Sequence, residues 1–214
     1  MKFVLIALLA TAVLSEHIWM GWTPRESGSA GYRQTNGDNG NAFGKYQFDR
    51  RYGLVPFMQW CYDYNSSRYS GFKKFINMGA GAAELQGNTE LAALWVSYCD
   101  NYPEEFGKLQ DVNAYNAYYT EITKYLKNLY GFHLVTKSPA VKGTAFSMAI
   151  RSGSLSAAYK FEGLSDSSDE KAILNQVYAT YGTADANRWT KEGQWGDALK
   201  AYDDWTYTDF PTSM

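Results

Sequence analysis

TPRESGSAGYRQTNGDNGNAFGKYQF, running from Thr23 to Phe48, is the most informative stretch of this 214-residue chain. It places one carboxylic acid, Glu26, ahead of a loop rich in Gly, Asn and Asp, a composition typical of turns. A carboxyl group that donates a proton to a substrate needs an apolar wall and nearby polar groups that hold the ligand. Trp22 and Phe43 would supply such a wall. The segment therefore predicts a catalytic acid at Glu26.

Three short blocks in this stretch carry a resemblance to a known superfamily. They are Glu26-Ser27-Gly28, Gly37-Asp38-Asn39-Gly40 and Gly44-Lys45-Tyr46-Gln47-Phe48. The pattern resembles the lysozyme-like superfamily of goose-type lysozymes and lytic transglycosylases, in which Glu-Ser is followed about twenty residues later by Gly-x-x-Gln. It is most similar to the phage- and bacterium-associated peptidoglycan hydrolases of that superfamily. Glu26 and Gln47 are 21 positions apart (47 − 26), and a looser likeness extends over residues 23 to 182.

The resemblance implies a set of site residues. Glu26 would be the general acid, and Asp38 would be a second carboxylate that directs a water molecule or stabilises the transition state. The expected substrate-binding residues are Ser27, chiefly through its turn, together with Tyr46, Gln47 and Arg151. Arg151 stands where lytic transglycosylases carry an Asn, so this contact departs from the pattern of those relatives.

Each catalytic assignment has a structural alternative. Glu26 follows Pro24 and could be a helix-end carboxylate favoured by the helix dipole. Asp38 lies in Asn-Gly-Asp-Asn-Gly, where Asp is also an ordinary turn residue. Asp49 and Glu84 are further candidates for the second carboxylate.

The resemblance predicts a hydrolase that cleaves the β-1,4 bond between N-acetylmuramic acid and N-acetylglucosamine in peptidoglycan. Two alternatives remain open, namely a chitosanase or chitinase on the same fold, and a non-catalytic module that binds the cell wall. We expect no cofactor and no metal, because His17 and His133 stand apart in the sequence and no Cys-x-x-Cys or His-Glu-x-x-His occurs.

Composition and the first residues bear on the compartment. Residues 1–15 combine Lys2 with an apolar run, which is typical of a signal peptide, so residues 16–214 would form one secreted or vacuolar/phagosomal domain. A formal net charge of −2 without a basic patch disfavours nucleic-acid binding. We expect a monomer that has no membrane contact after signal removal. In a secreted chain, Cys61 and Cys99 would pair in a disulfide or, alternatively, remain as buried thiols.

Hydrophobic spacing predicts a mainly α fold of the lysozyme-like kind, with at most a small β-hairpin within residues 30 to 43. One helix should open at Asn88 or Thr89, and another should stop at Gly131. Ser167 and Glu170 form a capping-box pattern ahead of a third helix. Residues 184–214 contain Trp189, Trp195, Tyr202 and Trp205, which would close the core or stack on sugars.

Overall fold

The computed structural model describes residues 15–179, 207–211 and 213–214 of the chain. The fold is mainly α with a small hairpin, as predicted. The α-helices are α1 (Thr23–Ser27), α2 (Leu54–Tyr64), α3 (Lys73–Ile76), α4 (Thr89–Asn101), α5 (Pro103–Ala114), α6 (Thr120–Tyr130), α7 (Pro139–Ser152), α8 (Ser154–Ala158) and α9 (Glu170–Ala179). Short 3-10 helices connect them, at η1 (Gly28–Arg33), η2 (Ser70–Phe72), η3 (Ala83–Leu85), η5 (Leu134–Thr136) and η6 (Tyr159–Phe161), and η4 (Tyr115–Tyr119) is a π-helix.

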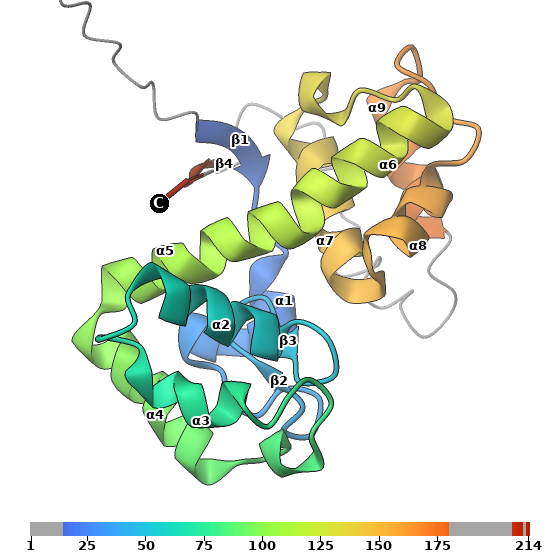
Figure 1. Ribbon diagram of the computed structural model, residues 1–214. Helices are drawn as coiled ribbons and strands as arrows, with labels where there is room; N and C mark the ends of the chain where they lie inside the picture. Colours follow the sequence, from blue (N-terminus) through green and yellow to red (C-terminus); the bar gives the residue numbers. More distant parts are fainter. Residues whose placement is uncertain (1–14, 180–206, 212) are drawn as a thin grey trace, which may run out of the picture.

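The helices gather into two lobes joined by one long helical rod (Figure 1). The first lobe contains α1 to α4 and the β2–β3 hairpin, and the second contains α6 to α9. The rod runs from α5 through η4 into α6 without a break, so it passes from one lobe to the other. This arrangement leaves the hairpin of the first lobe facing the end of α7 in the second.

Side-chain caps explain where several helices begin and end. The Asn88 side chain accepts a hydrogen bond from the Leu91 amide at 2.9 Å, so the predicted start of α4 is confirmed. Gly131 ends α6 in the left-handed conformation with φ 63°, as predicted. The third helix differs from the prediction. The Asp169 side chain accepts from the Ala172 amide at 3.0 Å, and α9 begins at Glu170, so Asp169 takes the capping place expected of Ser167.

Two small antiparallel sheets accompany the helices. In the hairpin, β2 (Ala42–Phe43) pairs with β3 (Phe48–Asp49), and an isolated bridge joins Gly37 to Ala42. The hairpin thus lies further along the chain than predicted, because its turn is built by Gly44 (φ 74°) and Gln47 (φ 52°). The second sheet pairs β1 (Ser15–Trp19) with β4 (Tyr207–Pro211), which the sequence did not predict.

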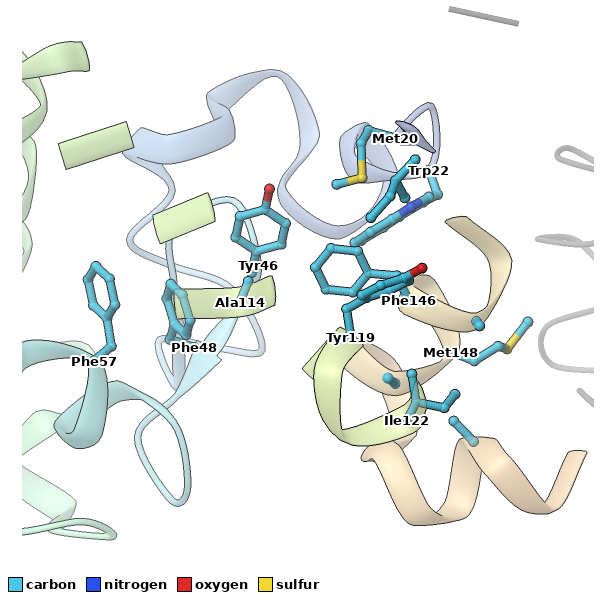
Figure 2. Close-up of a cluster of buried hydrophobic side chains, with 14 of the residues drawn as sticks. Met20, Trp22, Tyr46, Phe48, Phe57, Ala114, Tyr119, Ile122, Phe146 and Met148 are labelled. Carbon is cyan, nitrogen blue, oxygen red and sulfur yellow. The ribbon is translucent and has the colours of Figure 1, made fainter. Parts of the chain in front are cut away.

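A continuous aromatic core holds the two lobes together (Figure 2). Phe48 of the hairpin stacks on Phe57 of α2, with ring centroids 4.4 Å apart. Tyr46 stacks on Phe146 of α7 at 6.0 Å, and Trp22 meets the same Phe146 ring edge-on at 5.4 Å. Aromatic pairs of this kind add to the stabilisation that burial alone provides. The core therefore fixes the hairpin relative to α7.

The predicted disulfide is wrong. Cys61 and Cys99 are free, buried thiols. Cys61 belongs to the apolar face of α2, while the Cys99 thiol of α4 donates to the Tyr32 carbonyl oxygen at 3.4 Å. An even number of cysteines cannot reveal whether two side chains point toward each other, which is what a disulfide requires.

Some of the predictions concern residues that the structure does not describe. Residues 1–14 of the predicted signal segment lie outside the described residues, as do Trp189, Trp195, Tyr202 and Trp205. Within the part of the chain that is described, no helix combines the length and apolar character needed to cross a bilayer.

Candidate active site

A cleft of about 810 Å³ lies between the two lobes. The first lobe contributes carboxylates, an amide and an aromatic ring, the rod contributes Tyr118, and the end of α7 contributes the opposite wall. The lining residues are Glu26, Asp38, Ala42, Gln47, Asp49, Arg51, Tyr52, Tyr118, Ile150, Arg151, Ser152 and Gly153. Four predicted site residues, Glu26, Asp38, Gln47 and Arg151, therefore meet in one cleft although they are spread over much of the sequence.

Glu26 lies in the last turn of the short helix α1 and is partly exposed. This helix is held by local bonds, because the Thr23 hydroxyl donates to the Met20 carbonyl at 3.0 Å and the Ser27 hydroxyl donates to the Thr23 carbonyl at 3.3 Å. Gly28, with φ 59°, then turns the chain away. Glu26 is thus presented to the cleft from a fixed turn.

Gln47 is positioned by a tight turn that follows strand β2. Its backbone has φ 52°, and its side-chain amide donates to the Gly44 carbonyl at 2.9 Å. A Cβ on Gly37 would lie 1.7 Å from the Gln47 side-chain oxygen, so a larger residue at position 37 would displace this amide. The turn is anchored to α5, because the Lys45 amide donates to the Gln110 side chain at 3.0 Å. The amide of Gln47 is therefore preorganised at the cleft wall.

Arg51 links two carboxylates on the same wall. Its guanidinium donates to Asp49 Oδ2 at 2.5 Å and to Asp38 Oδ2 at 2.9 Å. Asp49 Oδ1 accepts further bonds from the Arg51 amide at 2.7 Å and from Nε at 2.8 Å. Partial burial acts to raise the pKa of the Asp49 carboxyl, but the hydrogen bonds and charge of Arg51 outweigh burial and hold the pKa below its usual range. Asp49 is consequently an ionised partner of Arg51.

Two predicted substrate-binding residues lie outside the cleft lining. Ser27 is buried and bonds within α1. Tyr46 is fully buried, and its hydroxyl donates to Asp111 Oδ1 at 2.5 Å. Burial and the Asp111 charge raise the pKa of Tyr46 well above its ordinary value. Both residues therefore shape the turns that carry Glu26 and Gln47, and neither reaches the space where a substrate would lie.

The apolar wall also differs from the expectation. Trp22 and Phe43 are fully buried in the core, and the aromatic and aliphatic lining comes from Tyr52, Tyr118 and Ile150 instead. Tyr52 is 74% exposed, so its ring is accessible for stacking on a ligand. Glu84, a candidate second carboxylate, does not line the cleft, whereas Asp49 does.

Arg151 stands on the wall formed by the end of α7. The helix ends at Gly153, which has φ 79°, and the Ser154 hydroxyl then donates to the Tyr118 carbonyl at 3.1 Å. This bond ties the wall to the rod. Arg151 is exposed, and the lining residues from this wall, Ile150 to Gly153, include no carboxylate. The cleft thus has an acidic side in the first lobe and a cationic side in the second.

Arg51, Tyr52 and Tyr118 were not assigned to the site from the sequence. Arg51 and Tyr52 directly follow the hairpin, and a signal for them was the Asp49-Arg50-Arg51-Tyr52 cluster beside the Gln47 block. Tyr118 has no such local signal, because its place depends on the path of the rod.

Comparisons with known proteins identify no relative. No protein family, no curated protein and no solved structure matches the chain. Among the described residues, no group of three or more His, Cys, Asp or Glu side chains is arranged to hold a metal ion.

Proposed function

We propose that this protein is a peptidoglycan hydrolase that cleaves the β-1,4 bond between N-acetylmuramic acid and N-acetylglucosamine, with Glu26 as the general acid. The observation that supports this proposal is the joint lining of one cleft by Glu26, Asp38, Gln47 and the exposed ring of Tyr52. Glycosidases need a proton donor and a second carboxylate, and sugars bind through amide hydrogen bonds and aromatic stacking. These groups are all present on the cleft walls.

The hydrogen bonds divide the roles of the two aspartates. Asp49 uses both oxygens to bind Arg51. Asp38 binds Arg51 through Oδ2 alone, and its Oδ1 accepts no hydrogen bond from any described residue. We therefore assign Asp38 as the carboxylate that accepts a proton from the attacking water or stabilises the positive charge of the transition state. Arg51 would hold Asp38 in place, and Asp49 would balance the charge of Arg51.

The proposed reaction begins when the glycan lies across the cleft with a sugar ring on Tyr52. Glu26 donates its proton to the glycosidic oxygen, and the bond to the anomeric carbon breaks. Water activated by Asp38 then adds to that carbon and gives a reducing sugar. A neighbouring oxygen of the substrate itself is the other possible nucleophile, and it would give an anhydro sugar. Mass analysis of the products distinguishes these two outcomes.

The enzyme would act on bacterial walls outside the cytoplasm. Residues 1–15 would direct secretion or delivery to a vacuole or phagosome, and the mature chain would act as a monomer on the wall. It needs no cofactor for this chemistry.

The test is lysis of purified cell walls, measured as the decrease in turbidity of the wall suspension. Glu26→Gln keeps the shape of the side chain but removes the transferable proton, so the rate should fall by at least about 10²-fold while the protein stays folded. Glu162→Gln is the matched control, because Glu162 is exposed and does not line the cleft. Its rate should equal that of the wild type.

Other outcomes identify the alternatives. Undiminished lysis by folded Glu26→Gln protein would reject Glu26 as the acid. Wild-type protein that cleaves chitin oligosaccharides but not walls would indicate a chitinase, and protein that binds walls without cleaving them would indicate a binding module.

A further inference from the structure

The hydroxyl of Tyr118 stands out among the polar groups of the cleft. Tyr118 is partly buried and lines the cleft from the rod. Its carbonyl oxygen accepts from the Ser154 hydroxyl, but its own side-chain hydroxyl makes no hydrogen bond to any residue that the structure describes. A phenolic hydroxyl in such a position normally has a partner, because leaving it unpaired costs free energy. The missing partner is therefore to be sought in the cleft.

Tyr118 belongs to η4, the π-helix of the rod. Tyr115 and Tyr119 stack with ring centroids 5.0 Å apart, and both hydroxyls donate to Glu16, at 2.6 and 2.8 Å. Lys142 of α7 contacts the same carboxylate at 3.1 Å. The hydroxyls of these two tyrosines are therefore occupied by the partly buried Glu16. Tyr118, which lies between them in the sequence, lines the cleft instead. π-Helical turns inside α-helices are uncommon and are frequent at functional sites.

The surroundings of the hydroxyl keep its proton in place. A Cβ on Gly53 would lie 3.1 Å from the Tyr118 hydroxyl oxygen, so the absent side chain keeps this position uncrowded. Burial, together with the negative charge of Asp49, raises the pKa of Tyr118. The group is therefore a neutral donor throughout the physiological pH range, suited to an uncharged oxygen acceptor.

We propose that Tyr118 is a substrate-binding residue whose hydroxyl donates a hydrogen bond to an oxygen of the bound sugar, either a ring hydroxyl or an acetamido carbonyl. This inference rests on the proposed function, because it assigns a contact within the same cleft. The proposed contact lies in the π-helix η4, at the point where the rod passes the cleft.

The test compares Tyr118→Phe with Tyr125→Phe. Tyr125 is a partly buried tyrosine of α6 that does not line the cleft, so it is a matched control. Tyr118→Phe should lower kcat/KM on soluble glycan fragments by about 3- to 10-fold, the range for one neutral hydrogen bond. Its thermal unfolding midpoint should equal or exceed that of the wild type, since the free protein loses no hydrogen bond. Tyr125→Phe should leave kcat/KM unchanged.

Binding measurements separate this inference from the proposed reaction. Titration of Glu26→Gln protein with N-acetylglucosamine oligomers and with peptidoglycan fragments, with and without Tyr118→Phe, reads the contact without catalysis. A loss of affinity of the same size supports the assignment even if no cleavage is ever seen, a result that would reject only the hydrolase. Unchanged kcat/KM and affinity in Tyr118→Phe, or a lowered unfolding midpoint with no loss of affinity, would overturn the assignment, as would a chain that binds neither ligand.

Discussion

The side chains of Asp38, Asp49 and Arg51 form one hydrogen-bonded unit, in which Asp38 Oδ1 is the oxygen that accepts no bond from a described residue. Asp49 is saturated by Arg51, so replacing Asp38 removes the free carboxylate oxygen of that wall. Asp38→Asn should lower turnover by about 10²- to 10⁴-fold, the usual range for a lost general base. Folding should be intact, because Asp38 is exposed in a loop. Single-turnover rates and circular dichroism check both statements. Activity within a few-fold of wild type would return Asp38 to the role of a turn residue and favour the substrate-assisted route.

Arg151 is the cationic side chain on the α7 wall of the cleft. It faces a cleft whose other wall is acidic, so it would attract the carboxylates of muramic acid or of the wall peptide. Arg151→Gln should lower the rate on cell walls by about 10-fold or more at low salt, in line with a charge-assisted hydrogen bond, and by less at high salt. The rate on uncharged chitin oligosaccharides should change little. An equal loss on both substrates would show that Arg151 does not recognise a negative charge.

The turn of the β2–β3 hairpin positions Gln47. A Cβ on Gly44 would lie 2.3 Å from the Gln110 side-chain oxygen and 2.7 Å from the Trp95 ring, and Gly44 also has φ 74°. Gly79 has a similar φ of 85°, but a Cβ added there would meet no atom within 4 Å. Gly79→Ala should therefore cost about 1 to 2 kcal/mol for backbone strain alone. Gly44→Ala should cost clearly more, and it should also reduce activity. Urea denaturation of the two variants measures the difference, and equal losses would mean that crowding at Gly44 is unimportant.

Helix ends could be predicted from the sequence where a local side chain or glycine sets them. Caps are local, so Asn88 and Gly131 were identified correctly from residue type and spacing. Ser167 was not the cap, because Asp169 offers a carboxylate closer to the first turn of α9. Tyr46 and Gln47 are adjacent in the sequence, but Tyr46 is buried in the core whereas Gln47 lines the cleft. Gln47 has a positive φ in the turn that separates the two side chains, and sequence spacing does not reveal that angle.

The cleft depends on the aromatic core that joins the two lobes. Phe146 of α7 contacts the rings of Trp22, Tyr46 and Tyr119, which come from the first lobe and the rod. Phe146→Ala should cost about 3 to 5 kcal/mol of unfolding free energy and should also weaken ligand binding, because the two walls lose their common support. Phe161→Ala removes a ring that packs on Phe132 within the second lobe. It should lower stability comparably and leave affinity unchanged, as titration of both folded variants would show.

The pairing of segments that lie far apart in the chain could not be predicted from the sequence. Helical periodicity was enough for the mainly α class, but the pairing of β1 with β4 joins residues 15–19 to residues 207–211. Nothing local in either segment indicates its partner. The position of Tyr118 in the cleft has the same origin, since it depends on how the rod passes between the lobes.

The two free thiols give the molecule a pair of internal chemical reporters. Burial raises the pKa of the Cys99 thiol to about 11, and it raises that of Cys61 well above its ordinary value, so neither ionises appreciably near neutral pH. An alkylating reagent can then react only while the surrounding structure is open. Because Cys61 lies on α2 and Cys99 on α4, the two labelling rates follow the transient opening of separate parts of the first lobe. A ligand that stabilises the closed form of the first lobe would slow this labelling. The labelling rates of the native cysteines therefore measure how often the lobe that carries Glu26 opens.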